Sequence, residues 1–248
     1  MQSGIVVAVG FLVGSLSPHV SLARDSADEV ARIHIEAMGG AGRIAALAGL
    51  RATGHVTVGG RRVRFTMVAA RPNRVRVETQ SGGRTLVQST DGVEAPWEYD
   101  TATLPPRYRI MPEATARAFA ANAEFDNPLV AGASRGYAFD FAALVDAGDR
   151  KLLRVLVTRN LIETFSLMVD PETYLIAMRV EHRISPGGRR INIVTRFDDF
   201  RPVDGILLPH QVTVEVDGTV TQQTKIDRMD GNPELPDGTF TMPKEGAG

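Results

Sequence analysis

Long stretches of alternating apolar and polar residues restrict the fold of this chain more than any other feature. In the segment RRVRFTMVAARPNRVRVETQ, Val63, Phe65 and Met67 alternate with arginines and a threonine, and the alternation resumes at Val75 after the residues RPN. A period of two residues is that of a β-strand whose side chains point alternately to its two faces. The segment therefore predicts a β-hairpin with one apolar and one charged face.

The same kind of pattern recurs along most of the chain, with Gly, Pro, Asn and Asp in the short connections. Short connections make consecutive strands antiparallel neighbours, and no alternation of strands with helices indicates a parallel sheet. We expect a mainly β (α+β) domain, in which roughly eleven antiparallel strands curl into a half-closed β-barrel. Beyond residues 51–80, the strand-like segments are 84–90, 95–100, 137–145, 151–158, 161–169, 174–184, 189–200, 207–217 and 219–229.

Three short helices are expected beside these strands. Ser26 and Glu29 have the spacing of a capping box at the start of a helix over residues 26–39, which Gly39 and Gly40 would end. A second helix fits residues 43–50, and a third follows Pro112 over residues 113–124. We predict that these helices form a small lid, with Ala116, Phe119 and Ala123 on the inner side of the third.

Composition excludes several classes of function. The formal net charge of −1 argues against nucleic acid as the main partner, since phosphate binding needs a surplus of positive charge. The absence of cysteine excludes disulfides, thiolate nucleophiles and cysteine-ligated metal centres. We expect no cofactor, no metal and no catalytic residue. No linker divides the chain, so residues 24–248 are expected to form one domain.

The first residues have the pattern of an export signal. An apolar run from Gly4 to Leu16 is shorter than a membrane span, and Ser21 and Ala23 are spaced as small residues before a cleavage point. No lysine or arginine precedes the run, which leaves retention as an anchor open. We predict a signal over residues 1–23, cleavage near Ala23 and a periplasmic location.

The inner face of the predicted barrel is too apolar to be left in water. At about 1.5–3 kcal/mol for each large apolar side chain, its exposure would cost tens of kcal/mol. The helices are small and rich in alanine, so we predict a cavity for an apolar ligand, although complete filling of this space by helices and loops stays open. The predicted cavity residues are Val56, Val58, Val63, Phe65, Met67, Val75, Val77, Phe165, Leu167, Val180, Ile193, Val212 and Val214.

Several segments, in their order along the chain, carry a resemblance to a known family. They are AMGGAGRIAALAGLRATG, RPNRVRVE, DGVEAPWEY, EFDNPLV, MVDPETYLI and DFRPVDGILLPHQVTVEVDG. In this order the chain, from Asp25 to about Pro243, resembles periplasmic lipoprotein-sorting proteins of the LolA/LolB type and their uncharacterised relatives. The resemblance implies a carrier of lipid or of lipoprotein acyl chains, with a membrane-bound loading or acceptor protein and transient contact with a membrane surface. The alternative is an envelope sensor or interaction module that recognises a lipoprotein or another protein.

Three other patterns point to different functions. His210, with His182 as its partner, could mark a metal site, but we favour two histidines hydrogen-bonded at the rim of the sheet. The sequence GASRG places Ser134 in a nucleophile-elbow motif, but no strand precedes it and no helix follows it. Arginines 62, 64, 74 and 76 would form an outward patch, which suits either anionic lipid headgroups, an acidic partner or plain solvation.

Overall fold

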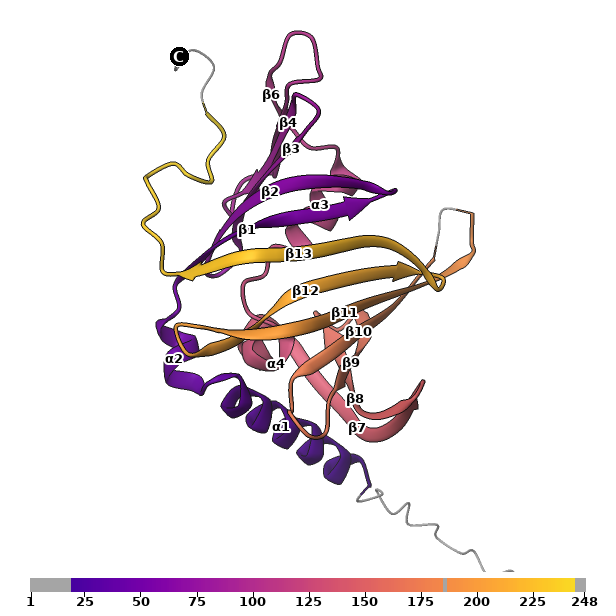
Figure 1. Ribbon diagram of the computed structural model, residues 1–248. Helices are drawn as coiled ribbons and strands as arrows, with labels where there is room; N and C mark the ends of the chain where they lie inside the picture. Colours follow the sequence, from indigo (N-terminus) through magenta and orange to yellow (C-terminus); the bar gives the residue numbers. More distant parts are fainter. Residues whose placement is uncertain (1–18, 185–186, 244–248) are drawn as a thin grey trace, which may run out of the picture.

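The computed structural model describes residues 19–184 and 187–243, and its main element is one antiparallel sheet of 13 strands (Figure 1). The mainly β fold expected from the alternation is confirmed, with more strands than the eleven or so expected. Part of the difference is β6, whose three residues are too few for an alternation to be read. The strands are β1 (Gly49–Val58), β2 (Arg61–Ala70), β3 (Arg74–Ser81), β4 (Arg84–Thr90), β5 (Trp97–Asp100), β6 (Tyr108–Ile110), β7 (Tyr137–Ala147), β8 (Arg150–Arg159), β9 (Glu163–Val169), β10 (Ile176–Ile184), β11 (Arg190–Val203), β12 (Ile206–Val216) and β13 (Thr219–Gly231).

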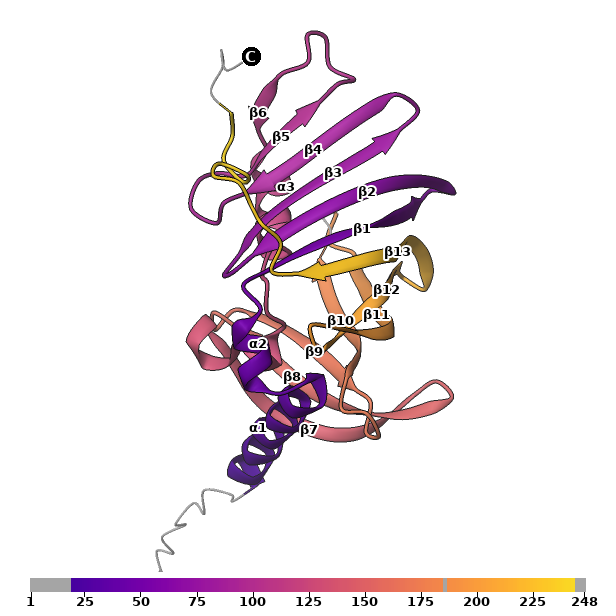
Figure 2. The ribbon, with the colours of Figure 1, turned by 60° about the vertical axis from the view of Figure 1, so that its left-hand side comes forward.

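The strand order shows how the sheet curls without closing. It runs β6-β5-β4-β3-β2-β1-β13-β12-β11-β10-β9-β8-β7, so the first and last strands of the chain, β1 and β13, meet in the middle. β6 and β7 form the two edges, and in the described part of the chain they do not pair with each other. Figure 2 shows the strands fanning from β6 to β7 around a hollow face. The half-closed barrel is therefore the observed architecture.

The helices cover one end of this hollow face. α1 (His19–Met38) packs against β7, and α2 (Ala41–Ala46) follows it directly. α3 (Glu113–Ala121) lies behind β1 and β2 in Figure 1, and a short α4 (Pro128–Ala131) leads into the 3-10 turn η1 (Gly132–Arg135). α4 and η1 were not expected from the sequence.

Several helix boundaries differ from those predicted, and α3 ends at Ala121 rather than at residue 124. α1 begins at His19, so Ser26 lies inside the helix and the capping box is wrong; Glu29 instead pairs with Arg32 one turn later. α2 ends at Ala46 rather than residue 50, because Leu50 already pairs with Ala69 in the sheet. The predicted stop after α1 is confirmed, since Gly39 and Gly40 have positive φ angles of 131° and 91°.

The close approach of Gly39 to the β11–β12 turn explains why a glycine is needed there. A Cβ atom at this position would lie 2.3 Å from the carbonyl oxygen of Gly205. Any side chain would therefore push α1 away from the sheet.

The predicted export signal over residues 1–23 lies mostly outside the described residues, and it stays a prediction.

The segment after β13 folds back over the outer face, where the carbonyl of Phe240 accepts hydrogen bonds from Ser89 Oγ at 3.0 Å and Trp97 Nε1 at 2.8 Å. This segment covers the outer face of β2 and β4, where Phe240 packs against Val68.

Candidate ligand-binding cavity

A cavity of about 480 Å³ lies where the helices meet the hollow face of the sheet. Its floor is formed by β9 to β12, and its cover by α1, α2 and the loop between α3 and α4. The volume is within the range of about 300–1,000 Å³ that is usual for ligand pockets. The wall is mostly apolar and includes Met38, Ile44, Leu47, Leu50, Phe125, Val130, Leu167, Ile176, Phe197, Phe200, Leu207, Leu208 and Val212.

Arg71 holds the cover of the cavity together. Its guanidinium group donates to the carbonyls of Leu47 at 2.8 Å and Ile44 at 2.6 Å at the end of α2, where carbonyls lack partners from a next helical turn. It also pairs with Asp126 and lies over the ring of Phe125, with 4.9 Å from Cζ to the ring centroid. Burial raises the pKa of Asp126 although Arg71 opposes this shift. One arginine thus joins α2 to the α3–α4 loop.

His34 and Asn127 form a second link across the cover. His34 is 2% exposed, its Nδ1 lies 2.7 Å from the carbonyl oxygen of Tyr174, and its Nε2 lies 3.1 Å from Asn127 Nδ2. Because a carbonyl can only accept, Nδ1 carries the proton and Nε2 accepts from the amide. Asn127 Oδ1 in turn accepts from the backbone amides of Leu129 and Val130, so the same side chain caps α4. Burial lowers the pKa of His34, which favours this neutral form.

A third polar group lies where the α3–α4 loop meets β7 and β8. Tyr137 donates its hydroxyl to Glu124, and Arg159 Nη1 lies 3.5 Å from the same carboxylate. Burial and the contact with Glu124 raise the pKa of Tyr137 to about 12. The tyrosine therefore stays a neutral donor, which suits a fixed structural contact better than proton transfer.

The floor of the cavity carries an ion pair on a surface that is mostly apolar, with Thr195 opposite it on β11. Arg179 and Glu181 both project from β10 into the hollow, with 2.8 Å between Arg179 Nε and Glu181 Oε1. The guanidinium group also lies over the ring of Phe165, 4.2 Å from its centroid. Both charged side chains are largely buried, so they are the strongest candidates for contacts with a polar part of a ligand.

Most of the predicted cavity residues lie on the hollow face, although few of them reach the cavity itself. Leu167 and Val212 line the cavity. In the other half of the sheet, Phe65 packs with Val56 and Met67, and Val75 packs with Val77 under α3. The strand register places Val58, Val63, Phe165, Ile193 and Val214 on this same face.

Val180 is the exception, because it lies on the outer face opposite Val194 and Ser166. The register of β10 against β9 shifts between Ile176 and Met178. A bulge of one residue reverses the alternation of every later residue in a strand. Arg179 and Glu181 therefore take the inward positions that the alternation predicted for Val180 and its neighbours.

The predicted lid residues lie on or next to α3. Phe119 and Ala123 pack against Ala69 and Val75, while Ala116 is half-buried. None of the residues of α3 itself is fully buried. Their role as a lid stays a prediction.

The residues proposed for chemistry do not assemble. Ser134 follows α4 rather than a strand, and its hydroxyl donates to the carbonyl of Ala131 at 2.8 Å. His210 is buried with Nδ1 3.0 Å from the Leu208 carbonyl, whereas His182 is exposed on β10, with β11 between them. Within residues 19–184 and 187–243, no cluster of His, Asp and Glu is placed to hold a metal ion.

The expected row of four arginines is also wrong. In the β2–β3 hairpin Arg64 lies opposite Gln80, and Arg76 opposite Val68, because residues pair at equal distances from the turn. Arg74 and Arg76 lie over the rings of Phe240 and Trp97 at 5.5 and 5.6 Å. Arg62 and Arg64 lie at the other end of the hairpin and form a separate group.

Comparison with solved structures places this architecture among known ones. A domain assigned to outer membrane lipoprotein sorting from Vibrio parahaemolyticus matches with a TM-score of 0.59 and 10% identity, over 88% of this chain and 97% of the other. A DUF1329 family protein from Desulfovibrio piger matches with the same values. A LolA superfamily protein from Nitrosomonas europaea has a TM-score of 0.51 and 14% identity, also over 88% and 97%. These matches establish the fold.

The resemblance inferred from the sequence is thus confirmed for the fold. No protein-family model and no curated protein matches the sequence. Among the helices that the structure describes, none has the length and hydropathy of a membrane span.

The residues that sequence analysis missed are mainly polar ones around the cavity. A signal existed for His34, which is four residues after Val30 and four before Met38 and so shares the buried face of α1. Arg71 and Asn127 lie in loops without periodicity, and only the tertiary contacts reveal their roles.

Proposed function

We propose that this protein binds a lipid, or the acyl chains of a lipoprotein, in the cavity and carries or holds this ligand in the periplasm without changing it chemically. The observation that carries the proposal is the mostly apolar cavity of about 480 Å³ between the hollow face of the sheet and the helices. Burial of hydrocarbon in such a space contributes about 0.8 kcal/mol for each CH₂ group. The fold shared with a lipoprotein-sorting domain and the export signal predicted at the N-terminus support the same proposal.

Entry and exit of the ligand would require the cover to move. α3, which leads into the α3–α4 loop of the cover and whose Ala121 lines the cavity, is the best candidate for the moving part, since it has no fully buried residue and little packing would be lost when it shifts. Ala116, Phe119 and Ala123 would then act as the lid over the apolar residues of β2 and β3. The contacts of Arg71 with Ile44 and Asp126 would keep α2 and the α3–α4 loop together during this movement.

The proposal is tested by filling the cavity. In Val212→Trp a large ring would enter the cavity from β12. In Val180→Trp the same ring would lie on the outer face of the sheet, on β10. We expect native mass spectrometry and lipid extraction to recover lipid from the wild type and from Val180→Trp, with strongly reduced recovery from Val212→Trp.

Recovery of no lipid from the wild-type protein purified from the envelope would contradict the proposal and favour the interaction module instead. Equal recovery from both tryptophan variants would show that the ligand lies outside this cavity.

A further inference from the structure

The outer face of the sheet carries a basic groove at one edge. The groove has a volume of about 790 Å³ and is formed by β1 to β4 and the β3–β4 turn. Arg62, Arg64 and Arg84 line it together with His55, Gln80 and the backbone of Gly82 and Gly83. It is separate from the cavity, since the side chains of His55, Arg62, Arg64 and Gln80 point to the other face of the sheet.

Two of the three arginines that line this groove, Arg62 and Arg64, have no carboxylate partner among the described residues. Arg84 pairs with Asp100 and His55 with Asp227, but no ion pair in the described part of the chain involves Arg61, Arg62 or Arg64. Elsewhere most surface arginines have a carboxylate partner, as Arg196 has Glu215 and Arg201 has Asp199. Neighbouring like charges repel, so a cluster of arginines without carboxylate partners creates a positive electrostatic potential that attracts an external anion.

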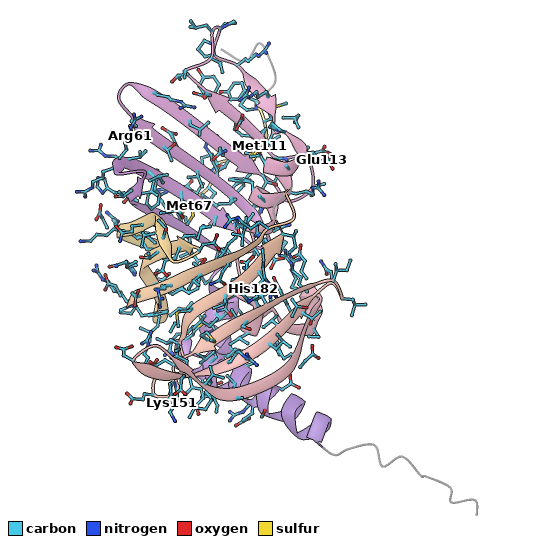
Figure 3. All side chains as sticks on the ribbon, turned by 90° about the vertical axis from the view of Figure 1, so that its right-hand side faces the viewer. Arg61, Met67, Met111, Glu113, Lys151 and His182 are labelled. Atoms are coloured by element: carbon cyan, nitrogen blue, oxygen red, sulfur yellow. The ribbon has the colours of Figure 1, made fainter. Side chains whose placement is uncertain are left out.

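Apolar side chains are exposed at the turns along the same edge of the sheet. Val58 ends β1 and Val220 lies at the start of β13, and each is 49% exposed. Leu104, in the loop between β5 and β6, is 93% exposed. The β1–β2, β3–β4 and β12–β13 turns lie along one edge of the sheet, as Figures 1 and 2 show. Figure 3 shows Arg61 at this edge.

The combination of arginines and exposed aliphatic tips favours one kind of partner. Arginines at the level of phosphate groups, with aliphatic side chains reaching the boundary of the acyl chains, are typical of proteins that bind the surface of an anionic bilayer. An acidic protein would be matched by the arginines but would leave the exposed aliphatic side chains at the turns without an apolar partner.

The hollow face connects this edge to the cavity. Beyond Val212, the half-buried Val214 continues the apolar surface along β12 toward the β12–β13 turn, while Thr224 and Gln222 of β13 lie between it and Val56 on β1. A hydrocarbon chain passing between the cavity and a bilayer at this edge would contact Val212 and Val214 along β12.

We propose that the basic groove and its turn tips, Val58, Leu104 and Val220, dock the protein on an anionic phospholipid bilayer. This inference names the membrane on which the proposed lipid carrier would act, so it rests on the proposed function. Its test is independent, because binding to a vesicle can be measured whether or not the cavity holds lipid.

The test is vesicle co-sedimentation of the full chain with phosphatidylcholine alone and with phosphatidylcholine mixed with phosphatidylglycerol. We expect binding only to the mixed vesicles, and weaker binding at high salt. Arg62→Glu/Arg64→Glu should weaken binding by about 30-fold or more, since each basic residue near the surface contributes about fivefold. Val58→Ser/Val220→Ser should weaken binding at high salt as well.

Two controls separate docking from misfolding and from net charge. Arg62→Lys/Arg64→Lys keeps the charge and should bind like the wild type. Arg117→Glu/Lys151→Glu makes the same change in net charge at exposed residues away from the groove, and should also bind normally. Figure 3 shows Lys151 far from Arg61.

Wild-type binding that does not depend on phosphatidylglycerol, or equal loss in both charge-reversal variants, would overturn the proposal. No binding to either vesicle would also overturn it and leave the groove to an acidic protein. Lipid extraction from the same samples separates the two proposals: a wild type that carries lipid but ignores vesicles refutes docking alone, and one that binds vesicles but never carries lipid refutes the carrier alone.

Discussion

The side-chain amide of Asn127 donates to Nε2 of His34 across 3.1 Å, and so joins the start of α4 to the buried face of α1. The amide oxygen is already used by the backbone amides of Leu129 and Val130. The amide therefore cannot turn around without losing the cap of α4. This arrangement fixes the orientation of Asn127 and the protonation state of His34 together.

Replacement of Asn127 by alanine should destabilise the protein by about 1–3 kcal/mol, because it removes a helix cap and leaves a buried ring nitrogen without its donor. Urea unfolding followed by circular dichroism measures this loss. Asn122→Ala is the matched control, since Asn122 is exposed at the end of α3, and it should change stability by less than about 0.5 kcal/mol. Equal effects would show that the cap and the histidine contact are unimportant.

Stability should fall as the pH decreases below about 6.5, the usual pKa of an unfolded histidine. Burial lowers the pKa of His34 in the folded state, so the unfolded state takes up a proton first and is favoured. While the pH stays above the folded pKa, the contribution of this group is at most about 1.4 kcal/mol per pH unit. Above pH 6.5 both states are neutral and His34 has no effect.

Urea unfolding at several pH values, compared between the wild type and His34→Gln, isolates this contribution from that of the carboxylates. We expect a flatter profile below pH 6.5 for the variant. Parallel profiles would mean that His34 is protonated equally in both states.

Arg71→Ala should cost about 2–4 kcal/mol, because it leaves the Leu47 carbonyl without a donor, removes one of two donors to the Ile44 carbonyl and leaves the half-buried Asp126 without its partner. Arg71→Lys keeps the charge but not the forked geometry, so we expect an intermediate loss. Hydrogen exchange of the α2 amides should rise in the same order. Unchanged exchange in Arg71→Ala would refute the role of Arg71 in joining α2 to the α3–α4 loop.

Replacement by alanine should change the stability in opposite directions at Gly39 and at Gly42. Gly39→Ala places a Cβ 2.3 Å from the Gly205 carbonyl at a φ of 131°, so we expect a loss of at least about 2 kcal/mol. Gly42 lies in α2 with nothing within 4 Å of its Cβ position, and its replacement should stabilise by up to about 1 kcal/mol. Thermal unfolding of both variants measures this difference, and a shift of the same sign would contradict the proposed close approach.

Local patterns predicted the elements of this fold better than they predicted the cavity. The alternation at Val63, Phe65 and Met67 placed these residues together on one face, because it reflects the pleat of a single strand. Pro112 and Gly39 likewise marked helix ends by their own backbone preferences. The cavity wall could not be assembled in this way, since α1, α2 and the α3–α4 loop meet it from distant parts of the chain.

The sequence by itself determined that the chain forms antiparallel strands with one apolar face, because side-chain alternation and turn residues act within a few neighbouring positions. Only the tertiary structure decided the bulge that turns Val180 outward and Arg179 inward, and the separation of Arg64 from Arg76 along their hairpin. The reason is that register and bulges depend on hydrogen bonds between strands. Those bonds form only when the whole sheet is assembled.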